Sequence, residues 1–209
     1  MKTLIAVPCM DKVDTPFFLS VVGMETEGDV QYVTAVSSLI YDARNHLAKI
    51  AVDGGFDRVL WLDSDMVFEK DLFKRLSARL DEGYDIVSGL YFTRKPPINP
   101  VAYSDFAFEQ TEAGLEPTCV PHKDYPKNEI FQVAGVGFGC VMLKAKVLSD
   151  VLNEFGRPFS PNDYFGEDIS FCQRATALGY RIYVDPTVKL GHVGYTIFNE
   201  EVYERLNNQ

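Results

Sequence analysis

The sequence predicts an α/β domain with a Rossmann-like, mixed, mostly parallel central sheet flanked by helices. Short hydrophobic runs of strand type alternate with segments whose apolar residues recur at helical spacing. This alternation is typical of parallel sheets, because a helix usually makes the crossover between neighbouring strands. The 209 residues are 46% hydrophobic and 24% charged, as in an ordinary globular domain, and no repeat or low-complexity linker divides them. We therefore expect a single domain.

The alternation is clearest in the first half of the chain. We expect strands at 4–8, 30–36, 56–63 and 85–92, and helices at 39–53 and 72–82. Glycines follow both helical patterns, which is typical of helix ends. In sheets of this kind ligands bind at the carboxyl ends of the strands, so the residues that follow each strand are candidates for a site.

The second half is less regular. Three prolines within 94–100 exclude a helix, and 100–133 favours irregular hairpins with aromatic strands. Glycines at 135, 137 and 139 predict a flexible loop that leads into a strand. Helices are expected from Val147 to Gly156 and over 167–179, followed by a short strand and an irregular LGHVGY segment.

Charge and cysteine content narrow the class of protein. A net charge of −10 disfavours strong non-specific binding to nucleic acid or to anionic membranes. No stretch approaches the ~18 apolar residues of a membrane span, so no integral membrane segment is expected, and we see no signal peptide. Four widely spaced cysteines without a CxxC pair favour reduced thiols in a cytoplasmic protein. They are Cys9, Cys119, Cys140 and Cys172.

The most informative stretch is VLWLDSDMVF, where Asp63 and Asp65 end a strongly hydrophobic run. Burying an unpaired carboxylate is costly, so these acids either reach solvent at a strand end or hold something positive. Two oxygen donors at this spacing suit Mg²⁺ or Mn²⁺, with substrate phosphates as further ligands. A turn in which Asp and Ser bond to nearby backbone groups explains the same residues without a metal.

Two further features bear on the acid pair. Glu167 and Asp168 open a helix, where they complement its dipole or, after the flexible 160–166 loop, face a cleft and accept a proton from a hydroxyl group. His192 stands between two glycines, and a lone histidine is often only a hydrogen-bonded structural residue. Combined with the acid pair, it can complete a Mn²⁺ site through an imidazole nitrogen. His46 and His122 are expected to be structural.

Together, WLDSDMVF, GVGFGCVMLK and YFGEDISFCQRATALGYRIYVDPTVKLGHVG resemble GT-A-fold glycosyltransferases, in particular the family-two-like enzymes of bacteria and phages. The 41–45 segment (Y-x-A-R-N) and GLYFTRKPP are also similar to that group, and the resemblance covers about 3–196. It implies a GT-A domain with a nucleotide-binding half (1–93), an acceptor and metal-completing half (94–196) and a C-terminal helix (197–209). It also implies transfer of a sugar from a UDP- or GDP-linked donor, with Mn²⁺ or Mg²⁺, to a hydroxyl of a glycan, protein, lipid-linked glycan or modified base.

The resemblance further implies roles for individual residues. Asp65 and His192 would ligate the metal with Asp63, which would also contact the ribose or sugar of the donor. Asp168 would be the general base of an inverting reaction, and Glu167 would bind sugar or acceptor hydroxyls. The other donor-binding positions would be Pro8, Cys9, Met10, Asp11, Arg44, Ser64 and Gly137, the last within a 136–138 loop under the sugar.

The residues leave other functions open. A phosphohydrolase or phosphotransferase also uses DxD, although its motif is expected near the amino terminus and here follows two strands and a helix. A non-catalytic module that binds nucleotide sugars or glycans would need no base. If Asp168 only caps its helix, a retaining mechanism is open as well. Arg94 and Lys95, beside the proline turn, either assist diphosphate binding or form a solvated pair.

Overall fold

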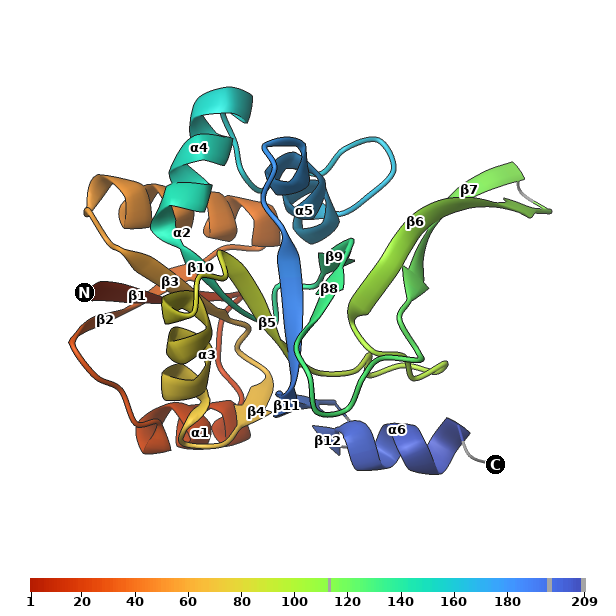
Figure 1. Cartoon of the computed structure of the whole chain (residues 1–209), viewed down its shortest axis with the longest axis horizontal. Coiled ribbons are helices and arrows are strands. Elements are labelled where there is room, and N and C mark those ends of the chain that lie inside the picture. Colours follow the sequence, from red (N-terminus) through yellow and green to blue (C-terminus); the bar gives the residue numbers. More distant parts are fainter. Residues whose placement is uncertain (113, 195–196, 208–209) are drawn as a thin grey trace.

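The computed structural model describes residues 1–112, 114–194 and 197–207. Within them, nine strands form a mixed central sheet, with helices packed on both of its faces (Figure 1). Along the main path the strands are β12 (Ile197–Phe198), β11 (Ile182–Val193), β5 (Ile86–Leu90), β10 (Cys140–Lys144), β3 (Arg58–Leu62), β1 (Lys2–Cys9) and β2 (Asp29–Val36), while β4 (Met66–Phe68) and β8 (Phe131–Val133) pair with β11.

The direction of the strands confirms the prediction of a mixed sheet. β1 runs parallel to β2 and β3, and β5 runs parallel to β11. β10 lies between β3 and β5 and is antiparallel to both, so β3 and β5 still point the same way. The carboxyl ends of β1, β2, β3, β5 and β11 therefore meet at one edge of the sheet.

Helices cover the two faces in two groups. α2 (Ile40–Asp53), α4 (Ala145–Phe155) and α5 (Glu167–Ala177) lie on one face, and α1 (Thr15–Gly23) and α3 (Leu72–Asp81) lie on the other (Figure 1). Strand β3 shows why both faces need cover. Trp61 packs into the core under α2 and α4, while Leu60 and Leu62 pack into the core on the α3 side.

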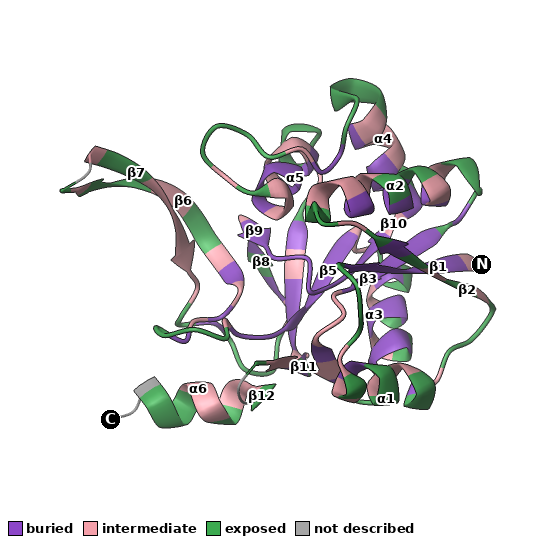
Figure 2. Ribbon diagram, turned by 180° about the vertical axis from the view of Figure 1, so that it is seen from behind, coloured by how far each residue is buried: buried purple, intermediate pink, exposed green. Residues whose placement is uncertain are grey.

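A second, three-stranded antiparallel sheet stands apart from the main one. It contains β6 (Ala102–Thr111), β7 (Gly114–Pro121) and β9 (Gly135–Val136). The β6–β7 hairpin projects well beyond the body of the molecule, and most of its outer part is exposed (Figures 1 and 2). The expected aromatic hairpin is thus present.

Several sequence predictions need correction. α1 and β4 were not predicted. The LGHVGY segment is not irregular up to Val193, since β11 bulges between Asp185 and Lys189 and then continues to Val193, paired with β4 and β12. Position 191 of this strand requires glycine, because a Cβ there would lie 2.5 Å from a methyl carbon of Ile197. The end of LGHVGY, residue 195, lies outside the described residues.

Three further sequence predictions concern the C-terminal helix, the cysteines and membrane-spanning segments. The expected C-terminal helix is α6 (Glu200–Asn207), and residues 208–209 lie outside the described part. All four cysteines are free, as predicted. Among the described helices, none is both long and apolar enough to cross a membrane.

Candidate functional site

A cavity of about 540 Å³ opens at the carboxyl ends of β3 and β5, between the amino terminus of α5 and the base of the β6–β7 hairpin. Its walls combine three carboxylates, three cations, one histidine and two tyrosines with a few apolar groups. The lining residues are Ile40, Arg44, Asp63, Tyr91, Thr93, Arg94, Lys95, Val101, Tyr103, Gly137, Phe138, Glu167, Asp168 and His192.

The two aspartates of the DxD motif point to different partners. β3 ends at Leu62, and a turn in which the Met66 amide donates to the Asp63 carbonyl (3.2 Å) carries the chain into β4. This turn breaks the two-residue alternation of a strand. Asp63 accepts a hydrogen bond from Arg44, while Asp65 faces His192 and Arg94. The two aspartates therefore belong to two adjoining sites, one around Arg44 and one around His192.

Arg44 joins the carboxylates of the first site. It lies on α2 with only 3% of its side chain exposed, and it donates to Asp63 (2.8 Å) and to Glu167 (3.3 Å). Burial lowers the pKa of Arg44, but Asp63 and Glu167 outweigh this and raise it overall. Burial raises the pKa of Asp63, and Arg44 opposes that rise. In this arrangement the guanidinium group of Arg44 binds Asp63 and Glu167 and is not available to bind a diphosphate.

Asp65 and His192 form the second site. His192 Nε2 lies 3.4 Å from Asp65 Oδ2, and His192 Nδ1 lies 3.0 Å from the carbonyl oxygen of Phe92. A carbonyl only accepts, so Nδ1 carries the proton and Nε2 is the nitrogen aimed at the carboxylate. Arg94 also forms an ion pair with Asp65 Oδ2. Despite burial, His192 and Arg94 lower the pKa of Asp65.

The donor set partly fits a divalent cation. Two ligands at ~2.1 Å from one ion lie about 3 Å apart at right angles, close to the separation of Asp65 Oδ2 and His192 Nε2. Asp63 is turned toward Arg44, and among the described residues no three His, Cys, Asp or Glu side chains gather as a complete metal cluster. Two protein ligands suffice for Mg²⁺-type sites, where water and substrate phosphates supply the rest.

Asp168 is the carboxylate best placed for proton transfer. It lies in the first turn of α5, and its Oδ1 accepts from the amide of Ile169 (2.7 Å). Its Oδ2 faces Gly137, where an added Cβ would lie 3.5 Å away. Burial, with the charge of Glu167, raises the pKa of Asp168 to about 6. The cap-like contact and the cleft-facing position predicted from the sequence thus occur together.

The glycine-rich segment is packed rather than flexible. The Tyr91 hydroxyl accepts from the amide of Gly139 (3.0 Å), and a Cβ at Gly137 or Gly139 would lie 2.5 or 2.8 Å from that side chain. Both glycines are therefore needed to let Tyr91 lie beneath the segment. Tyr91 and Tyr103 are site residues that were not predicted. Tyr91 lies in the GLYFTRKPP segment, but nothing in that segment singles out its side chain, and Tyr103 belongs to no motif.

Five expected donor-binding residues lie at the same edge of the sheet but do not line the cavity. Pro8 and Cys9 are buried at the end of β1, Met10 and Asp11 are exposed beyond it, and Ser64 lies between the two aspartates. The Asp14 amide donates to the Ser64 carbonyl (3.0 Å), so the segment before α1 contacts the DxD turn. The cavity brings together Arg44, Asp63, Gly137, Glu167, Asp168 and His192, with Asp65 bonded at its edge.

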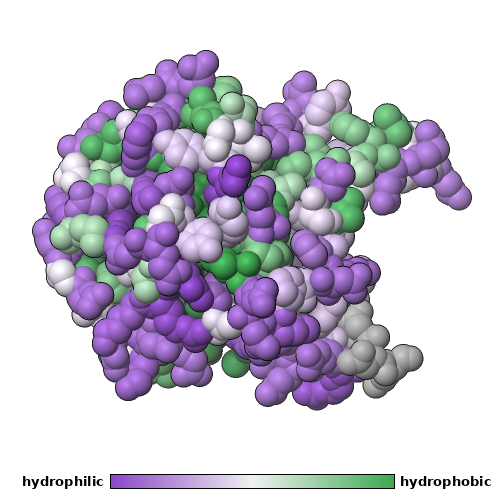
Figure 3. Space-filling view, in the orientation of Figure 1, coloured by the Kyte–Doolittle hydropathy of each residue, from purple (hydrophilic) through white to green (hydrophobic). Residues whose placement is uncertain are grey.

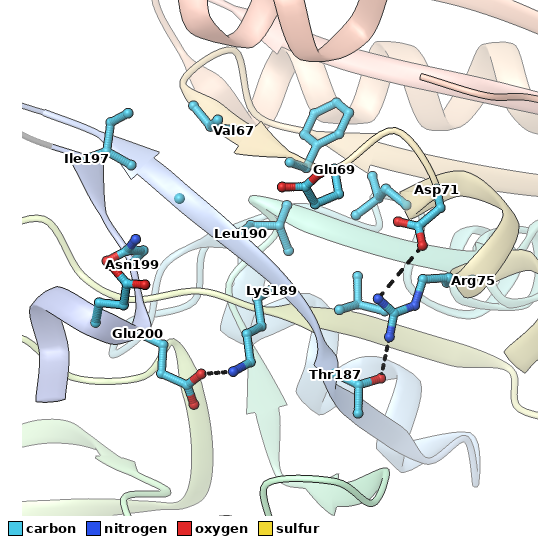
Figure 4. A pocket seen from close by; sticks show the side chains of 15 residues that line it. Val67, Glu69, Asp71, Arg75, Thr187, Lys189, Leu190, Ile197, Asn199 and Glu200 are labelled. Carbon is cyan, nitrogen blue, oxygen red and sulfur yellow. Dashed lines mark hydrogen bonds and ion pairs between the residues drawn. The ribbon is translucent and has the colours of Figure 1, made fainter. Parts of the chain in front are cut away.

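A second cavity, of about 440 Å³, is lined by residues of β4, α3, β11 and the start of α6 (Figure 4). Gly191 lines it, whereas its strand neighbour His192 faces the first cavity. Four of its charged side chains form ion pairs with each other. Lys189 contacts Glu200, and Arg75 donates to Thr187 (2.6 Å) beside Asp71. Among the described residues, its lining contains four carboxylates but neither a histidine nor a tyrosine.

Comparison with known proteins adds information on the fold alone. No protein-family model matches the chain, and no curated protein matches its sequence. Solved structures that resemble it comprise 315 chains. One is the crystal structure of A197 from STIV, with a TM-score of 0.66 and 22% sequence identity over 93% of this chain and 86% of that one. A fold shared so widely does not fix an activity, so function has to be argued from the cavity.

Proposed function

We propose that the chain is a metal-dependent glycosyltransferase of the GT-A type, which moves a sugar from a nucleoside diphosphate donor to a hydroxyl acceptor. The observation that carries the proposal is that two chemically distinct groups meet at one cavity. Asp168, with a pKa of about 6, and His192 both line it, and Asp65 pairs with His192 at its edge. A base and a cation-binding pair are what this transfer needs at its two reacting oxygens.

Asp168 supplies the base. A carboxylate whose pKa lies just below neutral pH is ionised under working conditions and still accepts a proton readily. Its Oδ2 is the oxygen that would take the proton of the acceptor hydroxyl, since Oδ1 is already bonded to the amide of Ile169. The acceptor oxygen then bonds to the anomeric carbon as the bond to the diphosphate breaks. Attack from the side opposite the leaving group inverts the configuration.

The Asp65–His192 pair suits the leaving group. Asp65 and His192 would hold Mn²⁺ or Mg²⁺, which neutralises charge on a departing diphosphate. Arg94 and Lys95 lie at the same cavity and add positive charge near that position. Such a site explains how a protein with a net charge of −10 can bind a diphosphate.

Arg44 and Asp63 line the same cavity. Arg44 fixes the carboxylates of Asp63 and Glu167, whose free oxygen atoms can accept hydrogen bonds from sugar hydroxyls. The phosphohydrolase alternative requires Asp63 as a nucleophile. Its bond to Arg44 ties up one of its oxygens and weakens that alternative.

A thermal-shift screen of nucleotide sugars, each with and without Mn²⁺, tests the proposal. We expect one donor class to stabilise the protein only when Mn²⁺ is present, since a ligand that binds only the native state raises its stability. Asp65→Ala and His192→Ala should each abolish the shift, whereas Asp53→Ala, on the exposed end of α2, should retain it. A metal-dependent shift that survives both site variants would reject the metal assignment.

A further inference from the structure

The proposed function leaves the acceptor unnamed, and the β6–β7 hairpin is the largest feature that it does not use. The base of this hairpin belongs to the cavity, since Val101 and Tyr103 line it together with Asp168. From there β6 and β7 run outward, away from the main sheet (Figure 1). The hairpin is thus continuous with the end of the cavity where the base lies.

A β-bulge aligns the aromatic residues of β6. Tyr103 pairs with Pro121 and Asp105 pairs with Val120, so two residues of β6 advance while β7 advances by one. The extra residue shifts the alternation of side chains. Tyr103, which would otherwise oppose Phe106 and Phe108, therefore shares their face, toward α5 and the loop before it.

The aromatic residues on this face form a row, which we name the aromatic stripe (Tyr103, Phe106, Phe108, Tyr164 and Phe165). Phe106 lies 5.4 Å from Phe165 and Phe108 lies 5.1 Å from Tyr164, measured between ring centroids. The outer rings are exposed, 48% for Phe108 and 59% for Tyr164. Figure 3 shows hydrophobic side chains gathered along this projection. Exposed rings grouped in this way usually mark a binding surface.

The charge of the hairpin restricts what can bind. Residues 102–121 contain Asp105, Glu109, Glu112 and Glu116 and no lysine or arginine. Glu109 and Glu116 face each other directly across the strands, an arrangement that repels further negative charge. They alternate with Phe108 and Pro117, so the carboxylates lie behind the stripe. An anionic chain is disfavoured, whereas a neutral or cationic one is not.

We propose that the aromatic stripe binds the acceptor, and that the acceptor is an extended glycan chain without negative charge. This inference rests on the proposed function, because the stripe is taken to deliver a hydroxyl group to Asp168. Sugar rings carry apolar C–H faces that pack on aromatic rings and hydroxyl edges that stay in water. From Tyr103 to Phe108 the strand rises by roughly 16 Å, which accommodates several sugar units.

At the end of the stripe nearest Asp168, the transfer needs only the acceptor and the donor. The terminal acceptor hydroxyl loses its proton to Asp168, its oxygen bonds to the anomeric carbon of the donor, and the electrons of the breaking bond leave with the nucleoside diphosphate. The chain grows by one sugar unit. The remaining units stay on the stripe, which favours longer acceptors over monosaccharides.

Binding of defined oligosaccharides to the full chain tests this inference. The probes are neutral chito-oligosaccharides and cello-oligosaccharides of one to six units, the cationic de-acetylated chito-oligosaccharides, and anionic oligogalacturonates. We expect affinity to rise with length in at least one uncharged or cationic series and to be absent for the oligogalacturonates. Phe108→Ser and Tyr164→Ser should each weaken binding about tenfold, as when one aromatic contact is lost from a binding surface.

Two controls separate this inference from the proposed function. Phe155→Ser removes a ring that is 41% exposed on α4, away from the hairpin, and should leave oligosaccharide affinity unchanged. The Mn²⁺-dependent donor shift is measured on every variant. Donor binding without binding of any uncharged or cationic oligosaccharide overturns the inference and leaves the proposed function standing. Oligosaccharide binding that depends on Phe108, without any donor shift, rejects the proposed function instead.

A further outcome would also overturn the inference. If the stripe joins two copies of the chain, light scattering will show a dimer that Phe108→Ser converts to a monomer, and oligosaccharides will not affect it. Equal binding of anionic and neutral chains would contradict the charge argument in the same experiment.

Discussion

The wall of the cavity and the β6–β7 hairpin contain the same kinds of residue in opposite environments. In the cavity wall, Arg44 is 3% exposed between Asp63 and Glu167, and Tyr91 is buried under Gly139. In the hairpin, the carboxylates reach solvent and Phe108 is half exposed. Burying charged side chains in the cavity wall costs free energy unless they are paired. Their presence there therefore indicates a catalytic or binding role. Exposed rings on the hairpin cost little, and they point to recognition.

The largest effect on stability is expected from the wall. Arg44→Met removes the cation and leaves Asp63 and Glu167 without their shared partner. We expect a loss of about 3–5 kcal/mol in the free energy of unfolding, as for other broken buried ion pairs. Urea denaturation measures it. Lys49→Met, on the same helix but in an exposed pair with Asp53, should cost no more than about 0.5 kcal/mol. Similar losses for the two variants would mean that the wall is not electrostatically coupled.

A second variant should change stability in the opposite direction. Burial raises the pKa of Asp168 from 3.8 to about 6, so the native state holds a proton that the unfolded state releases between these values. Ionising Asp168 therefore costs stability, fully above about pH 6 and not at all below about pH 4. Asp168→Asn should gain up to about 3 kcal/mol at pH 7, falling to near zero at pH 4.

The measurement is urea denaturation of this variant and the native protein at several pH values. Asp53→Asn, which alters an exposed carboxylate, should show no such gain. A loss of stability at pH 7 in Asp168→Asn would show that the carboxylate is a structural cap.

A smaller effect is expected at the proposed cation site, Asp65 and His192. Arg94 forms an ion pair with Asp65 at the oxygen that faces His192, so it competes with a divalent ion for that oxygen. Arg94→Ala should tighten Mn²⁺ binding about tenfold, equivalent to about 1.4 kcal/mol. Electron paramagnetic resonance of free Mn²⁺ measures the affinity directly. Lys95→Ala removes the same charge one position away, and an equal gain there would indicate a general effect of charge.

The smallest change in stability should come from the hairpin. Phe108→Ser alters an exposed ring, so the free energy of unfolding should stay within about 0.5 kcal/mol of that of the native protein. Thermal and urea denaturation test this. A loss of several kcal/mol would mean that the ring belongs to the core of the hairpin, and the contrast with the wall would disappear.

The same contrast explains what could be predicted from the sequence. The strands ending at Cys9, Leu62 and Leu90 and the helices α2 and α3 follow from local hydrophobic spacing, and they were predicted. Asp63, which follows β3, and His192, near the end of β11, also converge on one cavity with Asp168 from the start of α5, as expected at the edge where the strands have their carboxyl ends.

The remaining features depend on contacts between distant segments. Gly191 lies in a strand only because β4 and β12 pair there, and Tyr91 reaches the cavity only because Gly137 and Gly139 make room for it. The separation of Asp63 from Asp65 is set by Arg44 and Arg94, which lie on other elements. No local pattern in the sequence carries this information.

The most direct test of the central claim separates donor binding from transfer in Asp168→Asn. Nucleoside diphosphate release and the Mn²⁺-dependent donor shift are measured on the variant and on the native protein. We expect the variant to bind donor normally and to lose about 10²–10⁴-fold in release, as when a general base is removed. In the native protein, release should fall as the pH drops through about 6 and Asp168 takes up a proton. Undiminished release by Asp168→Asn would contradict the claim that this cavity catalyses glycosyl transfer with Asp168 as its base.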